Sequence, residues 1–335
     1  MAATLTADNT AFEVRDEYSV TLGAFNDSMG AAGYVGHRLF PLSLRTRGSG
    51  QYPKFRPEEE MFLEDYGTER KPDGTFKRSS AEWDADSYEV KTYGHEATID
   101  DERSNSFDDV LSAERSEQGR LLNMLRREFE RRIAVAATAE ASYDVSRIKG
   151  GLTAWSDGAA TVFADVDAQR DAFFDEFGGE PNALFLDRSD MRDALVSADV
   201  QPRLPGAVHV QPSELTMAVN ARRLAIALDL DFVFVANATR NRLPSRDFVR
   251  LWPKGKAVLA RVPVTDDPAE YCYGRTIVWD QFGDIEDDRI VFRAERYKEQ
   301  RPSSVVVRAR GSFVHKVLYP EGARLLLVDG AEQPT

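Results

Sequence analysis

The residues of this sequence with the clearest chemical potential are carboxylates, which occur in adjacent groups that could do acid–base work. Four groups stand out: Asp100-Asp101-Glu102, Asp108-Asp109, Asp266-Asp267 and Asp287-Asp288. A glycosidase needs two carboxyl groups held across one pocket, and adjacency along the chain does not provide that. Carboxylates at helix starts and turns are more typical of caps and solvated faces. The stretch "TIDDERSNS" also lacks the alternate spacing and central glycine of a calcium loop. The carboxylates therefore predict no catalytic or metal site.

Cysteine and histidine are too few and too scattered for nucleophilic or metal chemistry. The single cysteine, Cys272, lies among strand-forming residues in "EYCYGRTIVW", so we expect it to be buried in the core. One cysteine also excludes an intrachain disulfide. The histidines form no HxxxH or HxH pair, and we expect surface or packing roles for all four: His37, His95, His209 and His315. No Gly-x-Ser-x-Gly elbow is present, so we expect no enzyme activity, no metal and no cofactor.

The glycines near the N-terminus do not form a nucleotide-binding loop. Gly30, Gly33 and Gly36 in "GAFNDSMGAAGYVG" match neither GxGxxG nor GxxxxGK[ST]. No strand pattern leads into them and no convincing helix pattern follows. We interpret residues 1–45 as a flexible arm.

The overall charge limits the kind of partner that this chain can bind. The sequence has 335 residues, enough for one large or two modest domains, with 43 basic and 56 acidic residues, a net charge of −13 and a pI near 5.0. Such an acidic chain is not expected to grip nucleic acid through a broad basic face, although it could enclose nucleic acid. No apolar run approaches the ~18 residues of a membrane span, and the first residues lack the pattern of a signal peptide. We expect an intracellular protein at synthesis.

A charged segment and a change of strand face come before the first long helix pattern. Residues 46–87 are rich in charge, carry a turn signal at Pro72-Asp73-Gly74 and have little apolar periodicity. This pattern indicates either a disordered insertion or a hairpin that lies on a neighbouring subunit. In "DSYEVKTYGHEATID" the apolar positions switch from even to odd at Gly94, which predicts a bulge or a sharp bend there.

The helix pattern that follows is unusually long. It begins at Ser106 as an N-cap and extends to Ser142, which is 37 residues or roughly 55 Å at ~1.5 Å per residue. The apolar stripe consists of Leu122, Leu125, Phe129, Ile133 and Ala136, and the solvated side is expected to hold Arg126, Arg127, Glu130 and Arg131. Gly119 leaves open whether this is one kinked helix or two successive helices.

Residues 160–275 read as one α/β body and the tail reads as β-rich. The body has helix patterns in "DVDAQRDAFFDEFGG", "RSDMRDALVSAD" and "SELTMAVNARRLAIALDL", the last with a cap at Ser213. Its strand patterns are "NALFLD", "DFVFVAN", "AVLARVPV" and "TIVWD". The tail has "RIVFRAERYK", "SVVVRARGSFVHKVL" and "ARLLLV", which we expect to pair with the strand entering at Gly94 and to pack on the long helix.

This order of parts resembles the major capsid proteins of tailed bacteriophages, which have the Hong Kong 97-type fold. The resemblance rests on "YGHEATIDDERSNSFDDVLSAERSEQGRLLNMLRREFERRIA", on "GGEPNALFLDRSDMRDAL" and on "LAIALDLDFVFVANA", three collinear pieces within residues 40–330. It implies an α+β chain with an N-terminal arm at 1–45 and an extended β-hairpin loop at 46–93. It further implies a peripheral domain with a spine helix at 94–160 and 276–335, and an α/β axial domain at 161–275.

The resemblance also implies a role and partners. Shells of this family are icosahedral, are built from hexamers and pentamers, and enclose double-stranded DNA without sequence-specific binding. Partners would be further copies of the chain and separate scaffolding, portal and decoration proteins, in a virion capsid assembled in the host cytoplasm. Charged residues of the loop and helix would pair between subunits, and the candidates are Arg56, Glu58, Glu59, Glu60, Arg70, Lys71, Lys77, Arg78, Arg126 and Arg127.

The resemblance permits one negative expectation. The founding shell is crosslinked between a loop lysine and a C-terminal asparagine. This chain has the loop lysines Lys54, Lys71 and Lys77 but no asparagine after Asn241. We therefore expect a shell without this crosslink. Three alternatives stay open: an encapsulin-like nanocompartment, an α/β hydrolase with an acidic site, and a portal or tail component.

Overall fold

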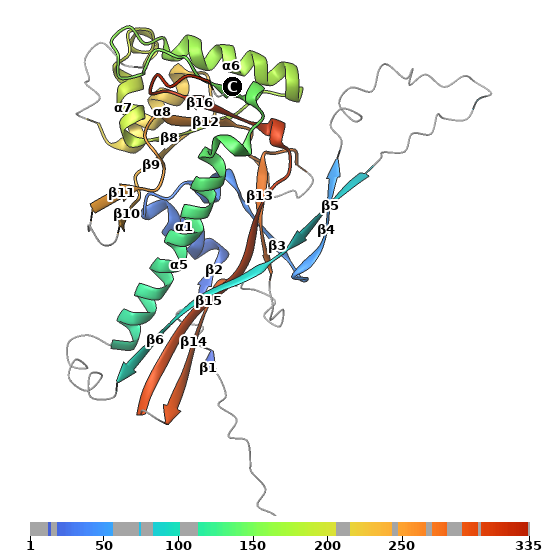
Figure 1. Cartoon of the computed structure of the whole chain (residues 1–335), viewed down its shortest axis with the longest axis vertical. Coiled ribbons are helices and arrows are strands. Elements are labelled where there is room, and N and C mark those ends of the chain that lie inside the picture. Colours follow the sequence, from blue (N-terminus) through green and yellow to red (C-terminus); the bar gives the residue numbers. More distant parts are fainter. Residues whose placement is uncertain are drawn as a thin grey trace, which may run out of the picture.

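The computed structural model describes residues 13–14, 19–55, 74, 83–100, 113–205, 215–242, 247–265, 270–279, 290–300 and 303–333. A long helix, α5 (Ala113–Thr138), connects a seven-stranded sheet at one end of the molecule with a five-stranded sheet at the other (Figure 1). No helix in the described ranges is both long and apolar enough to cross a membrane.

The seven-stranded sheet is built mainly from the tail of the chain. Its strand order is β1 (Glu13–Val14), β14 (Ile290–Gln300), β15 (Ser303–Val317), β13 (Gly274–Trp279) and β3 (Leu42–Arg45), with β2 (Val20–Thr21) on β14 and β6 (Lys91–Asp100) on β15. The predicted pairing of the tail with the strand at Gly94 is confirmed, because β6 and β15 are antiparallel from Lys91 to Asp100. The predicted bulge at Gly94 is wrong. Gly94 keeps register with Arg310, and the strand is interrupted at Val90 instead.

The five-stranded sheet has helices on one face and α5 on the other. Its order is β7 (Ile148–Lys149), β16 (Ala323–Leu327), β12 (Lys256–Ala260), β8 (Ala183–Asp187) and β9 (Phe232–Ala236). Leu184 and Leu186 of β8 pack toward α6 (Val162–Phe177), α7 (Arg188–Val196) and α8 (Met217–Ala227). Phe185 points to the opposite core, which contains Phe129 of α5.

Two strands belong to a different sheet than the sequence indicated. The tail strand "ARLLLV" is β16, which pairs with β12 of the five-stranded sheet and not with β6. The strand "TIVWD" is β13, which pairs with β15 and β3 of the seven-stranded sheet. A fully buried strand such as β16 carries no alternation that assigns it to one sheet or the other.

The three helices of the α/β body are confirmed, with one change at a helix start. Helix α6 ends at Gly178, whose φ of 70° gives the left-handed cap that its glycine predicted. Helix α8 begins at Met217 with Thr216 in the N-cap position, while the predicted cap Ser213 lies outside the described residues. A separate hairpin of β10 (Thr239–Arg242) and β11 (Asp247–Arg250) follows β9.

Helix α5 confirms most of the predicted stripe and corrects its ends. Leu122, Leu125, Phe129 and Ile133 are buried as predicted, and the helix passes through Gly119 without a break. It ends at Thr138, before a 3-10 turn at Glu140–Ser142, and so is shorter than predicted at that end. The predicted start at Ser106 lies outside the described residues.

The predicted flexible arm is wrong for the residues from Val20 onward. Helix α1 (Leu22–Ala31), the short α2 (Gly36–Leu39) and β3 are parts of the main core. Phe25, Met29 and Phe40 are completely buried there. The amphipathic pattern was hidden because α1 and α2 are short and small residues dominate the turn between them, where Gly33 has a φ of 74°.

Candidate assembly surfaces

A two-stranded stem extends away from the body of the molecule (Figure 1). Strand β4 (Ser49–Phe55) pairs antiparallel with β5 (Trp83–Glu89), with Tyr52 opposite Asp86. This pairing confirms the hairpin reading of residues 46–87 for the described part of that segment. The residues between the two strands lie outside the described residues, apart from Gly74.

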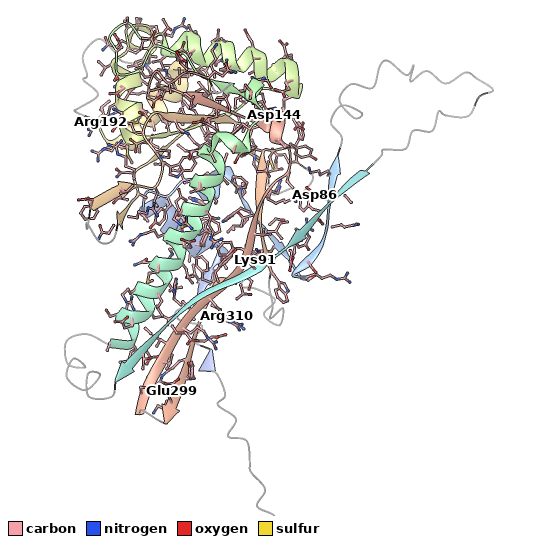
Figure 2. The ribbon with its side chains drawn as sticks, in the orientation of Figure 1. Asp86, Lys91, Asp144, Arg192, Glu299 and Arg310 are labelled. Carbon is pink, nitrogen blue, oxygen red and sulfur yellow. The ribbon has the colours of Figure 1, made fainter. Side chains whose placement is uncertain are left out.

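The base of this stem is fixed to the body by apolar packing and by lysines. Tyr52 and Tyr88 are buried in a cluster that includes Phe177 of α6 and Leu318. Asp86 lies 3.0 Å from Lys316 Nζ and 3.4 Å from Lys54 Nζ, and Figure 2 labels it on β5 where the hairpin approaches the body.

The lysine contacts change the ionisation of Asp86. Partial burial raises the pKa of its carboxyl, but the hydrogen bonds and charges of Lys316 and Lys54 outweigh this and hold the pKa below its usual value. Lys316 Nζ also donates to the carbonyl of Ser87 at 3.1 Å. The contacts of Lys316 on β15 with Asp86 and Ser87 on β5 therefore help to fix the direction in which the stem leaves the body.

The outer face of α5 carries charge that is largely paired within the chain. Glu128 contacts Arg131 at 2.6 Å and Arg132 at 3.0 Å. Arg132 also stacks 4.1 Å from the ring centre of Tyr93 on β6. These contacts join the helix to the edge of the long sheet.

A second charged cluster lies across the strands of the seven-stranded sheet. Glu295 of β14 is only 3% exposed and contacts Arg308 at 2.9 Å and Arg310 at 2.6 Å, both on β15. Arg308 in turn contacts Glu96 of β6 at 3.4 Å. Two guanidinium groups thus neutralise one buried carboxylate and join three strands.

Glu130 makes the most buried polar contact of α5, contrary to the prediction that it faces solvent. Its side chain is fully buried. Oε1 accepts hydrogen bonds from the backbone N–H of Val35 at 2.9 Å, from that of Gly36 at 3.0 Å and from Trp252 Nε1 at 2.7 Å. Oε2 accepts from Gly36 N–H at 2.9 Å. One carboxylate therefore joins α5, the start of α2 and the loop before β12.

The ionisation of Glu130 reflects opposing effects. Burial raises the pKa of its carboxyl, and the hydrogen bonds from Val35, Trp252 and Gly36 oppose that rise only in part. A Cβ on Gly36 would lie 2.7 Å from Oε2, so this approach of backbone to carboxylate requires glycine. The signals that could have found the site were the small residues of "GAAGYVG" and the position of Glu130 beside Phe129 on the apolar stripe.

Two of the predicted interface residues lie on α5. Arg126 is partly exposed and donates to Asn123 at 3.1 Å, and Arg127 is exposed. The remaining eight lie outside the described residues: Arg56, Glu58, Glu59, Glu60, Arg70, Lys71, Lys77 and Arg78. Sequence reasoning missed Glu130, Asp86, Lys316 and Trp252.

The residues considered for nucleophilic or metal chemistry mostly serve packing. Cys272 is buried as predicted, and burial raises the pKa of its thiol to about 11. His37 is buried and His315 is partly buried, both beside aromatic rings; His95 is exposed, and His209 lies outside the described residues. Within the described ranges, no group of three or more histidine, cysteine or carboxylate side chains is placed to hold a metal ion.

Comparison with known proteins identifies the fold. No protein-family model matches the sequence, and no curated protein matches it. Among solved structures, a phage-related protein from Bordetella bronchiseptica RB50 is similar with a TM-score of 0.66 and 17% identity over 95% of this chain and 99% of that one.

Two further solved structures are similar over most of the chain. The capsid of the cyanophage P-SCSP1u has a TM-score of 0.52 and 11% identity over 88% of each chain. A putative capsid protein of a prophage in Escherichia coli CFT073 has a TM-score of 0.51 and 9% identity over 92% of this chain and 99% of that one. The resemblance found in the sequence is thus confirmed at the level of the fold: the chain has the Hong Kong 97-type fold of phage capsid proteins.

Proposed function

We propose that this chain is a major capsid protein, which assembles through hexamers and pentamers into an icosahedral shell around double-stranded DNA. The observation that carries this proposal is the similarity to phage capsid structures over nearly the full length of both chains. A fold shared at such low identity can host different functions, so the proposal also rests on features of the chain itself.

The first supporting feature is the stem of β4 and β5. An isolated two-stranded hairpin is only marginally stable in water, yet this stem extends from the body and is fixed at its base by Tyr52, Tyr88 and Asp86. A projection held in a set direction suits a loop that reaches a neighbouring subunit. We assign residues 46–93 to such a loop.

The second supporting feature is the arrangement around α5. A 26-residue helix between two sheets suits a spine that carries force across a subunit. We assign α5 and the seven-stranded sheet to a peripheral domain, which is drawn mainly from residues 94–160 and 276–335. We assign residues 161–275 to an axial domain around the centre of each capsomer, together with β7 and β16 because they complete its sheet.

The charge of the chain suits a container for DNA. A net charge of −13 limits attraction between the shell and a tightly packaged polyanion. Single surface ion pairs contribute only ~0–1 kcal/mol, so shell stability would come from the repetition of contacts and from apolar burial between subunits. The proposed partners are other copies of the chain and separate scaffolding, portal and decoration proteins.

Negative-stain electron microscopy after size-exclusion chromatography tests the proposal. The chain is expressed alone and together with the genes that neighbour it, among which we expect the proposed scaffolding protein. Closed shells, tubes or ring-shaped capsomers are expected. Subunits that remain monomeric or dimeric under both conditions would contradict the proposal and favour the hydrolase alternative. Rings that are neither hexamers nor pentamers, with no closed shells, would favour a portal or tail component.

The contents of the shells separate a capsid from a nanocompartment. Particles purified from infected or induced cells are treated with nuclease and then opened. Protected double-stranded DNA is expected, and a packaged enzyme without DNA would favour the encapsulin-like alternative. Denaturing electrophoresis of the same particles is expected to show the shell subunit as one band near 37.5 kDa, and covalent ladders of this subunit would contradict the uncrosslinked shell.

A further inference from the structure

An apolar groove of about 530 Å³ lies between the N-terminal segment and the α/β body. The turn between α1 and α2 forms one wall, and α8 with the edge strand β9 forms the other. Phe232, at the start of β9, lines the groove and is 40% exposed. An aromatic side chain left half open to water in a groove is typical of a binding surface.

The rim of this groove is mainly basic. Arg38 and Arg222 are exposed and line it from opposite walls, and Asp231 is the one acidic residue that lines it. Neither arginine has an ion-pair partner among the described residues. His37, which also lines the groove, is held neutral because burial and the charge of Arg38 lower its pKa to about 4. An occupant with acidic groups around an apolar centre would therefore complement the groove.

The outer face of α6 has this composition. Asp171, Phe174 and Asp175 are exposed at helical spacing near the C-terminal end of the helix, and Asp167 lies one turn earlier. Phe174 is 53% exposed, although Phe173 and Phe177 on the same helix are buried. A large apolar side chain flanked by carboxylates on a surface helix has no role in the core of its own subunit.

The two surfaces lie at opposite sides of the five-stranded sheet. The groove follows β9, which is one edge strand. The C-terminal turn of α6 is held near the other edge, because Arg324 of β16 contacts Glu176 at 2.8 Å and Arg147 beside β7 contacts it at 2.6 Å. Figure 1 shows β9 on one side of this body and one end of α6 reaching beyond the other.

We propose that the groove of one copy receives α6 of a second copy, with Phe174 in the apolar groove and Asp171 and Asp175 beside Arg38 and Arg222. The contact joins two different surfaces, so it is head-to-tail, and repetition by a constant rotation closes a ring. The proposal rests on the proposed capsid function and identifies the contact that builds each capsomer.

Charge reversal with rescue tests this contact. Arg38→Glu with Arg222→Glu gives a groove variant, and Asp171→Arg with Asp175→Arg gives a helix variant. Each alone places like charges across the contact, and we expect capsomers and shells to be lost in both. A chain that carries all four changes restores opposite charges and is expected to assemble again.

Mixing the two variants gives a further readout. The acidic groove of the groove variant is complementary to the basic helix of the helix variant, and the basic groove of the helix variant is complementary to the acidic helix of the groove variant. The mixture is therefore expected to form rings in which the two variants alternate. A hexamer permits this alternation because its subunit number is even, and a pentamer does not. The matched control is Arg188→Glu with Arg192→Glu, which reverses two exposed charges on α7 and is expected to assemble normally. Circular dichroism and thermal melting establish that each variant is folded.

A single truncation completes the test. Phe174→Ala is expected to weaken subunit association by ~30-fold, as for a central interface residue, measured by sedimentation velocity. If the groove and helix variants assemble like the wild-type chain, the contact is wrong while the proposed function stands. If the chain with all four changes is folded but does not assemble, the proposed charge complementarity between groove and helix is refuted. Wild-type subunits that never assemble, even with the scaffold, would overturn both proposals.

Discussion

Replacing Glu130 with alanine would remove the carboxylate that joins α5 to the start of α2 and to Trp252. Three buried donors would lose their acceptor: the N–H groups of Val35 and Gly36 and the indole N–H of Trp252. Each unsatisfied buried donor costs ~1–3 kcal/mol. The lower end of that range gives a loss of about 3 kcal/mol in the free energy of unfolding for the three donors together.

Glu128→Ala is the matched control because Glu128 lies on the same helix and its side chain is 31% exposed. Its pairs with Arg131 and Arg132 are at the surface, so its removal should cost at most ~1 kcal/mol. Urea unfolding of unassembled subunits, followed by circular dichroism, measures both variants. Hydrogen exchange should show lost protection at the amides of Val35 and Gly36 in the Glu130 variant alone. If Glu130→Ala lowers the free energy of unfolding no more than Glu128→Ala does, Glu130 does not stabilise the subunit by joining α5 to α2 and Trp252, and the reasoning is refuted.

Three further perturbations have expected outcomes. Gly36→Ala would place a Cβ 2.7 Å from Glu130 and should destabilise the subunit by ~1–3 kcal/mol in thermal melts, whereas Gly23→Ala, which meets no atom within 4 Å, should be neutral or stabilising. Burial lowers the pKa of His37 to about 4, so stability should fall by about 3 kcal/mol as the pH drops from 6.5 to 4, and a His37→Leu variant titrated with urea should lose less over that window. Lys316→Ala should change stability by ~1 kcal/mol or less yet speed hydrogen exchange in β4 and β5, while Lys91→Ala, at an exposed position on β6, should leave both unchanged.

The sequence predicted best those elements whose burial is periodic. Leu122, Leu125, Phe129 and Ile133 recur at helical spacing, and only a helix puts them on one buried face. The Gly178 cap and the buried strand β8 were readable for the same reason, because local chemistry decides them. Strand β16 was assigned to the wrong sheet because its partner β12 is distant in sequence and all five of its residues are buried.

The buried hydrogen bonds of Glu130 were not predictable by the same reasoning. A hydrophobic stripe is drawn from apolar residues alone, so a carboxylate within it is assigned to solvent unless its partners are known. Those partners are two backbone N–H groups about 95 residues earlier and an indole 122 residues later. The N-terminal segment was misjudged because α1 and α2 are short, so Phe25 and Met29 alone mark the buried face of α1 and small residues surround them.

The structure also changes how the arginines of this chain are understood. The sequence analysis placed pairing between subunits on charged residues of the loop and the helix, and most of these lie outside the described residues. Elsewhere in the chain, Arg308 and Arg310 neutralise Glu295 within the subunit, and Arg324 contacts Glu176. These arginines support the fold, so their number says little about assembly.

The proposed contact between subunits uses charges that have no ion-pair partner among the described residues. Arg38 and Arg222 at the groove are such charges within the described residues, and Asp171 and Asp175 lie exposed on the opposite side of the same body. In the proposed contact, a few charges around one exposed phenylalanine would determine which surfaces meet. Specificity of this kind requires few residues, since mismatched like charges exclude the wrong contacts.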